Sequence, residues 1–318
     1  AAGRFALVAE GARAGLGTVA ALRALPLGPS LVELGADVVH AVAPALVPRV
    51  PPDLQLPLPA PALPPVAPAV QGRPVVYFPS CLTRIVGALP GEDAPPPARA
   101  MHDVLRWAGL SVRVPDGIEG LCCGMAFQSK GYPEAARAAA RRTAEALWRA
   151  SSGGRVPVVT DASPCAGTLQ DLVAEVLEEA GREVRMVDFP SFWAREVLPG
   201  LGEPPRRPGT AILHPTCTLI KSGGTGDLLA VARAHADRVE VPLFAECCGF
   251  AGDRGFLVPE LTASATAAEA AEIARILERE PGAGCYSTCR TCEIGMSRAV
   301  GRPFRSLLHL VHEAVSRA

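Results

Sequence analysis

A pair of adjacent cysteines followed by glycine occurs twice in the sequence, at Cys122–Gly124 in LCCGMAFQSKGY and at Cys247–Gly249 in ECCGFAGDRGF. Adjacent cysteines are poor disulfide partners, because a disulfide favours Cα atoms about 5.5 Å apart and a side-chain dihedral near 90°. Two such pairs in one chain of 318 residues therefore indicate that the thiols have another partner, of which a metal centre is the foremost candidate.

The remaining cysteines extend this repeat. A single cysteine precedes each pair, Cys81 in FPSCLTRIVG and Cys217 in HPTCTLIKSG, and each comes after an apolar run and shortly before a basic residue. Further cysteines come after each pair: Cys165 in DASPCAGT of the first half, and Cys285, Cys289 and Cys292 in CYSTCRTCEIG of the second half. The same order of so many features in both halves indicates an internal duplication.

Short runs rich in β-branched residues alternate with helical patterns in both halves. We expect strands at 73–80, 111–116, 155–163, 183–189, 209–216, 238–244 and 282–288, and a short strand with a helix at 302–315. We expect helices at 95–109, 133–152, 166–181, 226–237 and 259–280. This alternation predicts an α/β fold of two tandem units, each a mainly parallel sheet flanked by helices.

The pattern divides the chain into four segments: a helical segment at 1–47, a proline-rich linker at 48–74, a first unit at 75–200 and a second at 208–318. Most of the cysteines come just after a predicted strand. Ligands of open α/β sheets bind beyond the carboxyl ends of the strands. We therefore expect the cysteines of each unit to converge at one edge of its sheet.

Composition narrows the functional classes. The formal net charge is −1 and 49% of the residues are hydrophobic, as in ordinary globular proteins, and nothing favours nucleic acid as a partner. Prolines interrupt the apolar stretch Leu56–Val70, so we expect no transmembrane segment. No signal-peptide pattern is recognisable, and a first residue other than methionine suggests a fragment or a processed product. We expect a cytoplasmic location, or one peripheral to the inner face of the membrane.

Two kinds of metal centre compete for the thiols. A structural zinc site typically uses two cysteine pairs with two to four residues inside each pair, whereas such spacing occurs at one place only in this sequence, around Cys289 and Cys292. An iron–sulfur cluster takes cysteine thiolates as ligands and can accept adjacent cysteines on different irons. The candidate ligands are Cys81, Cys122, Cys123 and Cys165 in the first unit, and Cys217, Cys247, Cys248, Cys289 and Cys292 in the second.

Other residues near the cysteines have weaker assignments. Gly124 and Gly249 would let the backbone approach a bulky cofactor. Lys130 and Arg254 would offset the negative charge of a thiolate-ligated cluster, although a solvated surface charge explains them equally well. His214 is interpreted as a histidine packed at a strand end in preference to a hydrogen-bond donor to a cluster sulfur. No catalytic residue is identified.

The order Cys–spacer–Cys-Cys-Gly–spacer–Cys-x-x-Cys resembles the cysteine-rich CCG domain found in the B subunit of heterodisulfide reductase and in the iron–sulfur subunits of glycolate oxidase and lactate-utilisation proteins. FPSCLTRIVG, GLCCGMAFQSKG, HPTC and ECCGFAGDRGF are more similar still to the C-terminal part of bacterial FAD-binding and (Fe-S)-binding D-lactate or D-2-hydroxyacid dehydrogenases. The resemblance runs from residue 73 to the C-terminus.

This resemblance implies an oxidoreductase component that passes electrons from flavin and ferredoxin-like clusters to an acceptor, with both a quinone and a cytochrome compatible. FAD is then expected on a missing N-terminal region or on a partner flavoprotein. A ferredoxin-like iron–sulfur segment is a second expected partner, because the chain has no ferredoxin-type cysteine run of its own. The alternatives are a heterodisulfide reductase-like thiol–disulfide redox module and a structural zinc-binding protein.

The two copies are unequal. Thr168 occupies the place in the first copy that Cys292 has in the second. In the heterodisulfide reductase relatives the full motif binds a non-cubane cluster, so the resemblance implies the same for the second copy. The first copy has four thiols, which suits a cubane 4Fe-4S cluster, a degenerate site or none.

Overall fold

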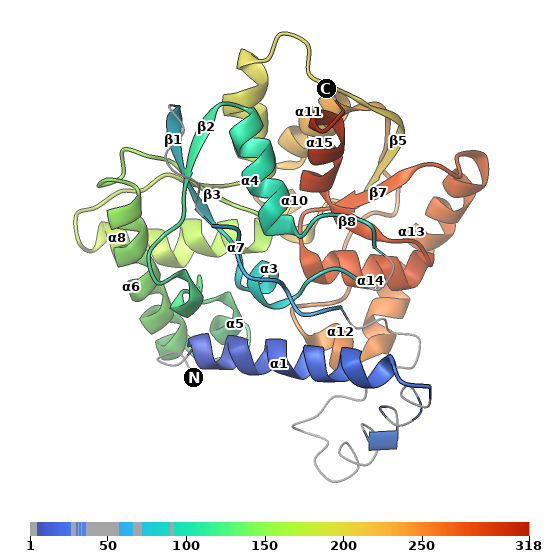
Figure 1. Cartoon of the computed structure of the whole chain (residues 1–318), viewed down its shortest axis with the longest axis horizontal. Helices are drawn as coiled ribbons and strands as arrows, with labels where there is room; N and C mark the ends of the chain where they lie inside the picture. The colour runs from blue at the N-terminus through green and yellow to red at the C-terminus, as the bar shows by residue number, and fades with distance from the viewer. Residues whose placement is uncertain are drawn as a thin grey trace.

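In the part of the chain that the structure describes, eight short strands form two separate parallel sheets. The computed structural model describes residues 5–26, 30, 32, 34–35, 57–65, 72–89 and 92–317 (Figure 1). The sheet orders are β2-β1-β3-β4 and β6-β5-β7-β8, and all neighbouring strands are parallel. The strands are β1 Arg73–Phe78, β2 Leu110–Arg113, β3 Val158–Thr160, β4 Met186–Asp188, β5 Arg207–Leu213, β6 Ala236–Glu240, β7 Gly284–Ser287 and β8 Phe304–Ser306.

Helices connect the strands, as the alternating pattern predicts. The first unit contains α3 Cys81–Ile85, α4 Pro97–Trp107, α5 Met125–Gln128, α6 Pro133–Ala150, α7 Ser163–Thr168, α8 Ala174–Glu178 and α9 Phe189–Phe192. The second contains α10 Cys217–Lys221, α11 Thr225–His235, α12 Arg254–Leu257, α13 Pro259–Arg279, α14 Arg290–Val300 and α15 Leu307–Val315. Shorter turns are 3₁₀ (η2 Ile118–Gly120, η5 Leu198–Gly200) or π-helical (η3 Leu169–Val173, η4 Trp193–Val197). The α/β class with two parallel sheets flanked by helices is confirmed.

The structure corrects two element boundaries around β6. The strand expected at 238–244 ends at Glu240, and Pro242, which has no N–H for a further ladder bond, comes soon after. The helix expected at 226–237 ends at His235, so that the next two residues already belong to the strand. The early end of β6 leaves a loop that leads directly to Cys247.

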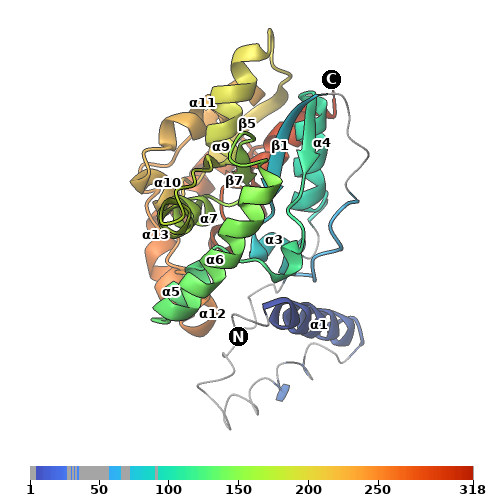
Figure 2. The same cartoon turned by 90° about the vertical axis from the view of Figure 1, so that its left-hand side faces the viewer.

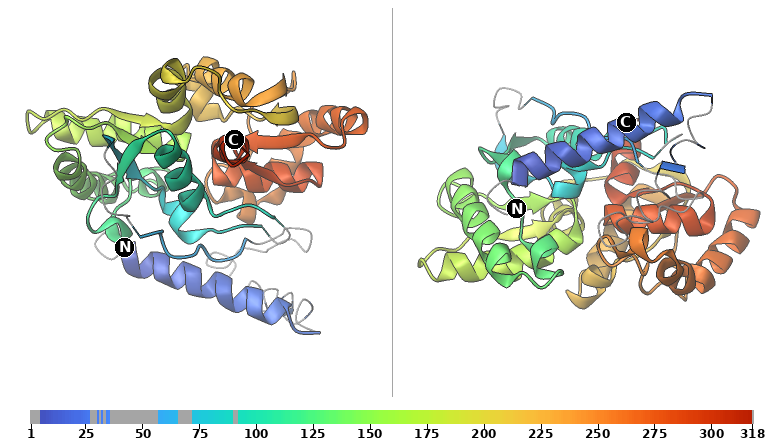
Figure 3. Two further views of the ribbon diagram at one scale, coloured as in Figure 1. Left: turned by 45° about the horizontal axis from the view of Figure 1, so that its top comes forward. Right: turned by 90° about the horizontal axis from the view of Figure 1, so that it is seen from below.

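An apolar core shared by the two units holds them together. Val75 and Tyr77 on one face of β1 and Ala211 and Leu213 on one face of β5 belong to it. α4 and α9 of the first unit and α11 and α15 of the second fill the space between the sheets (Figures 2 and 3). The opposite sheet faces pack separately, against α6 and α8 in the first unit and against α13 and α14 in the second.

The N-terminal segment is described only in part. The helix α1 (Phe5–Arg23) confirms that part of the expected helical segment 1–47 is helical. In the expected linker, residues 57–65 include an isolated antiparallel β-bridge from Pro59 to Val86. Residues 27–29, 36–56 and 66–71 lie outside the described residues. α1 lies at the end of the molecule where α3 and α12 are found (Figures 1 and 2).

α1 also has the length and the apolarity of a membrane-spanning helix, with 11% of its most apolar window buried. No such segment is expected from the sequence. Core helices and signal sequences have the same length and composition, so this match is weak evidence for a span. Within the described residues, α1 is the one helix that meets the criterion.

Trp193 joins the two units inside the shared core. Its side chain is fully buried, and its indole N–H donates to Nε2 of His235 in α11 over 2.8 Å. His235 in turn donates from Nδ1 to the carbonyl oxygen of Pro205, also over 2.8 Å. Both ring nitrogens of this buried histidine are therefore paired, one of them across the two units.

Substituting Trp193→Phe should lower the free energy of unfolding by about 1–3 kcal/mol, because it leaves Nε2 of His235 buried without its donor. The matched control is Trp107→Phe, since Trp107 is 40% exposed and a surface change of this kind costs about 0.5 kcal/mol or less. Urea unfolding followed by circular dichroism measures both. Equal losses in the two variants would contradict the role assigned to the Trp193–His235 bond.

Candidate metal centres

The first group of cysteines comes from three loops that lie after strands of the first sheet. Cys81 begins α3 directly after β1, Cys122 and Cys123 lie between η2 and α5, and Cys165 lies in α7 after β3. Their thiols form a chain of contacts in which Cys122 bonds Cys81 and Cys123, and Cys123 bonds Cys165. All are buried except Cys81, which is half-buried. The predicted convergence at one sheet edge is confirmed for this unit.

Polar contacts fix the loops that carry these thiols. Ser80 caps α3 by accepting a hydrogen bond from the Thr83 amide over 3.1 Å. Asp161, at the end of β3, accepts from the Ser80 amide over 3.0 Å and from the Tyr77 hydroxyl over 2.5 Å. Thr143 of α6 donates to the carbonyl oxygen of Cys122 over 2.8 Å. These contacts orient the cysteine backbone independently of any bound group.

Arg84 places a buried positive charge beside the first group. Its guanidinium donates to the carbonyl oxygens of Ile118 and Leu121 over 2.6 Å each. Hydrogen bonds from Cys123 and Cys81 lower the pKa of Cys122 to about 3, and the Arg84 charge acts in the same direction against the cost of burial. One thiolate is thus favoured within the group, and binding a cation would displace protons from its neighbours.

The second group repeats this arrangement. Cys217 begins α10 after β5, Cys247 and Cys248 lie in the loop after β6, and Cys289 and Cys292 lie at the start of α14 after β7. The sulfurs of Cys248 and Cys292 lie 3.0 Å apart. Cys217 contacts Cys247, and Cys289 contacts Cys292. Cys247 is exposed and Cys217 half-buried, whereas the other three are buried.

His214 lies against this second group, which the packed-histidine interpretation did not foresee. One of its ring nitrogens and the sulfurs of Cys248 and Cys292 all lie within 4.8 Å of one another. Burial lowers the pKa of His214, but hydrogen bonds to Cys248 and Glu269 outweigh it and raise the pKa to about 9. Contacts with Cys292 and then His214 lower the pKa of Cys248 to about 5 despite its burial.

The glycine after each pair allows the loop to pack against a helix. Gly124 has φ +105° and Gly249 has φ +65°, both in the left-handed region. A Cβ on Gly124 would meet the carbonyl oxygen of Ala136 in α6 at 2.9 Å, and one on Gly249 would meet that of Leu261 in α13 at 2.7 Å. Glycine is therefore required for backbone reasons, and its contact with a cofactor stays a prediction.

The charged residues predicted near the sites lie at the surface. Lys130 forms an ion pair of 2.7 Å with Asp253, which links the two cysteine-pair loops across the units, and both side chains are largely exposed. Arg254 begins α12 next to that pair. Their action on a bound cluster stays a prediction.

Cys285 and Thr168 explain how many thiols belong to each group. Cys285 lies in the buried strand β7 within the apolar core, where burial raises the pKa of its thiol to about 11; it belongs to neither group. Thr168 donates its hydroxyl to the carbonyl oxygen of Pro164 over 3.3 Å. The first unit therefore has four grouped thiols and the second has five.

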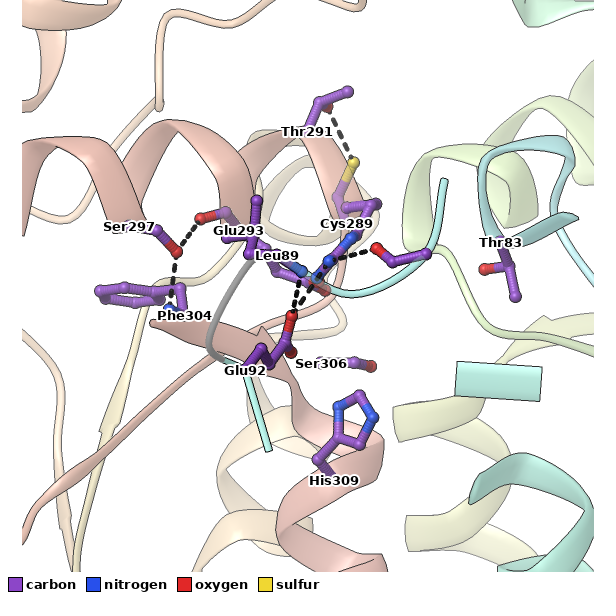
Figure 4. Close-up of polar contacts among 12 residues, drawn as sticks. Thr83, Leu89, Glu92, Cys289, Thr291, Glu293, Ser297, Phe304, Ser306 and His309 are labelled. Carbon is purple, nitrogen blue, oxygen red and sulfur yellow. Dashed lines mark hydrogen bonds and ion pairs between the residues drawn. The ribbon is translucent and has the colours of Figure 1, made fainter. Parts of the chain in front are cut away.

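A buried ion-pair network adjoins the second group. Arg290, next to Cys289, donates to Glu293 over 2.8 Å, to Glu92 over 3.1 Å and to the carbonyl oxygen of Gly87 over 2.6 Å. Figure 4 shows Leu89 and Glu92 beside α14, where Cys289 lies near Thr291. Burial raises the pKa of Glu293 to about 7, although Arg290 opposes this. The loop before α4 is thereby fixed to the second unit.

Arg84, Glu269 and the Arg290 network are functional neighbours that the sequence did not reveal. A signal exists for Arg84, because a basic residue soon after Cys81 is part of the repeat. No local pattern distinguishes Glu269 from the other acidic residues of α13. The pairing of Arg290 with Glu92 joins residues far apart in the chain, and only the packing of the two units brings them together.

The thiols suit a metal that prefers soft ligands. Grouped thiolates bind zinc or iron–sulfur clusters and are poor ligands for magnesium or calcium. Three loops at the carboxyl edge of a parallel sheet supply these thiols in each unit, and the unit occurs twice. This architecture defines a class of tandem cysteine-rich α/β proteins with two candidate metal centres.

Sequence comparison agrees with this class. The family model for the cysteine-rich CCG domain matches residues 75–170 and 211–297, so the chain belongs to the CCG cysteine-rich domain family and contains two copies of the domain. It is also similar to the C subunit of anaerobic glycerol-3-phosphate dehydrogenase from Escherichia coli strain K12 and from strain O157:H7. Identity is 29% over 176 residues in each case, covering 54% of this chain and 44% of the relative. The chain thus spans less than half the length of these curated relatives.

Substituting Gly249→Ala should lower the free energy of unfolding by about 2 kcal/mol or more, since it combines left-handed backbone strain with a clash against α13. Gly252→Ala is the matched control: its φ is +77°, but a Cβ there would meet open space, so only about 1 kcal/mol of strain is expected. Urea unfolding measures the difference. Equal losses would show that the packing of the loop on α13 does not require glycine.

Proposed function

We propose that this chain is an iron–sulfur electron-transfer component of a dehydrogenase-type oxidoreductase, with one metal centre in each CCG domain. The observation that carries the proposal is the convergence of nine of the ten cysteines into two groups at equivalent sheet edges. Membership of the cysteine-rich family and similarity to a dehydrogenase subunit support it.

Iron–sulfur chemistry is favoured over zinc by the composition of the second group. A structural zinc ion takes four ligands in a tetrahedron, whereas five thiols and one imidazole meet here. Neighbouring cysteines bind one ion with difficulty but can bind different irons of a cluster. We propose Cys81, Cys122, Cys123 and Cys165 as the ligands of the first centre, and Cys217, Cys247, Cys248, Cys289 and Cys292 as those of the second.

The chain's own residues have distinct roles in this proposal. A bound cluster would accept and release single electrons. The cysteine loops would hold it, and the buried Arg84 would offset its negative charge. Cys247 is exposed, so the second centre is the one that a redox partner can approach most closely.

The proposal also includes the type of substrate that the whole enzyme oxidises. The resemblance favours an FAD-linked D-2-hydroxyacid dehydrogenase of the D-lactate or glycolate type, and the curated relatives favour a glycerol-3-phosphate type. Each proposed substrate is oxidised at a C–OH group. In this proposal a flavoprotein and a ferredoxin-like segment supply electrons, and a quinone or a cytochrome accepts them. The 4Fe-4S type of the clusters, a non-cubane cluster in the second centre and a place at the inner face of the membrane belong to the same proposal.

The cofactor is tested by two measurements after anaerobic purification: the content of iron and acid-labile sulfide per chain, and the EPR spectrum. The wild type should contain one or two clusters, and Cys247→Ser/Cys248→Ser should lose the EPR signal of one of them, because two ligands of the second centre are removed. Cys285→Ser is the matched control, since this thiol lies outside both groups, and it should retain every cluster of the wild type.

Stoichiometric zinc without sulfide would refute the iron–sulfur proposal and favour a structural metal protein. Cys247 is exposed, so a disulfide substrate could reach it, and a heterodisulfide reductase-like activity is the second candidate function. If the isolated protein reduced a disulfide with an artificial electron donor, that result would favour the heterodisulfide reductase-like function over simple electron transfer.

The fifth thiol position of the CCG motif distinguishes the two copies. Thr168→Cys should change the EPR signal of the first centre towards that of the second, because it supplies the thiol that Cys292 supplies there. Anaerobic EPR of the variant measures this, with the unchanged signal of the second centre as an internal control. An unaltered first signal with iron still bound would show that this position does not set the cluster type.

A further inference from the structure

The second unit has a buried histidine and a buried carboxylate at a place where the first unit has neither. His214 follows β5 in HPTC, at the position of Phe78 in FPSC. On the helix that packs on each site, Glu269 of α13 stands where α6 has Thr143, counted from the prolines that begin the two helices. The side chains of His214 and Glu269 are 0% and 1% exposed. Such burial of a carboxylate requires a partner, and the ring of His214 supplies it.

Glu269 fixes both the orientation and the tautomer of the His214 ring. Nδ1 lies 2.9 Å from each carboxylate oxygen of Glu269, and an ionised carboxylate can only accept, so Nδ1 carries the proton. In the neutral ring, Nε2 then has a free lone pair. Carboxylates orient metal-binding histidines in this way, with one ring nitrogen donating to the carboxylate and the other left for the metal.

Nε2 is the ring nitrogen that is left for the thiols of the second group. It is buried and has no nitrogen or oxygen hydrogen-bond partner among the residues that the structure describes. One nitrogen of the ring and the sulfurs of Cys248 and Cys292 all lie within 4.8 Å of one another, and the two sulfurs are 3.0 Å apart. A buried polar atom without a partner is unusual in a native protein. A metal ion shared with the two thiols would satisfy it.

We propose that His214 is a ligand of the second metal centre and binds one of its irons through Nε2, next to Cys248 and Cys292. Glu269 is the positioning residue that keeps this lone pair free. The inference rests on the proposed iron–sulfur function and adds an imidazole to the five thiols named there. Imidazole and thiolate are both ligands of iron. A ring that carries a second proton in the metal-free protein releases it when the metal binds, as thiols do.

The two centres then differ in ligand chemistry. Phe78 has no atom that binds a metal, and Arg84 uses Nε, Nη1 and Nη2 to bind backbone carbonyl oxygens at the first group. The second centre has a neutral nitrogen ligand among its thiolates. Clusters in which histidine replaces cysteine have higher reduction potentials, so the imidazole raises the potential of the second centre.

Nitrogen hyperfine coupling in pulsed EPR is the direct test. In the anaerobically purified wild type, the signal of the second centre should show a strongly coupled nitrogen, and labelling with ¹⁵N-histidine should change that coupling. Cys247→Ser/Cys248→Ser identifies which signal belongs to the second centre. The first centre, with Phe78 at the position of His214, is the internal control and should show only the weak coupling of backbone nitrogens.

His214→Cys keeps a ligand atom at this position but exchanges nitrogen for sulfur. It should retain iron and sulfide, lose the strong nitrogen coupling and lower the midpoint potential of the second centre, because a thiolate adds negative charge. The expected size is a tenfold change in the reduction equilibrium, which is about 59 mV for one electron. His312→Cys is the matched control, being the same change at a half-buried histidine of α15 outside both groups, and it should alter neither coupling nor potential.

Glu269→Gln should weaken iron binding at the second centre, because an amide does not fix the tautomer that leaves Nε2 free. Loss of such a partner lowers metal affinity by about 10–100-fold, so a chelator should remove the iron of the second centre at a correspondingly lower concentration. Glu278→Gln is the same change at an exposed position of α13, and it should resist the chelator as the wild type does.

Three results would overturn the inference. Only weakly coupled nitrogen at the second centre of the wild type would show that His214 does not bind iron, and would leave the proposed function standing. A strong coupling that persists in His214→Cys would assign it to another nitrogen. A wild type without iron and sulfide would refute the proposed function itself, and this inference with it. If His214→Cys failed to fold, the ¹⁵N-histidine label in the wild type would still decide.

Discussion

The convergence of thiols at the carboxyl edges of two parallel sheets is the constraint on which the rest of the structure depends. Each group needs three loops held in one place, and the strands before those loops are only three to seven residues long. Such short strands supply little stability by themselves. The shared core of α4, α9, α11 and α15 supplies it, so the duplication that doubles the sites also stabilises the scaffold that positions them.

Duplication has kept the ligand loops and changed the residues that lie behind them. Both units retain a cap at the helix after the first strand, Ser80 in one and Thr216 in the other, and both retain the left-handed glycine. The side chain behind each group differs, being the Arg84 guanidinium at the first centre and the His214 imidazole, bonded to Glu269, at the second. Residues that fix the backbone are thus shared, whereas residues that set the electrostatics of each centre have diverged.

Much of this fold could be predicted from the sequence, and the reason is physical. Strand and helix periods are local, and a parallel sheet gathers the loops after its strands at one edge, so the cysteine groups could be predicted from spacing alone. The sequence predicts an end of β6 that is too late, because the apolar run continues past Glu240 into the loop. Glu269 and Glu92 were missed because their partners, His214 and Arg290, lie far away in the chain. Pairing of buried charges across elements leaves no periodic trace.

Under the proposed function, the surroundings of the two cysteine groups indicate which of them a partner protein can approach. Phe5 and Ala9 of α1 pack in one apolar cluster with Cys122, Ala139 and the half-buried Cys81, so the first group is covered. The second group has Cys247 exposed, and its loop also carries the exposed Leu243 and Phe244. Electron transfer between proteins requires close approach of the centres. Under the proposed function, the open second group would therefore be the contact with a partner, and the covered first group would exchange electrons with the second group. The hydrogen bond from the Ser163 amide to the Thr288 carbonyl oxygen directly links the loops of the two groups.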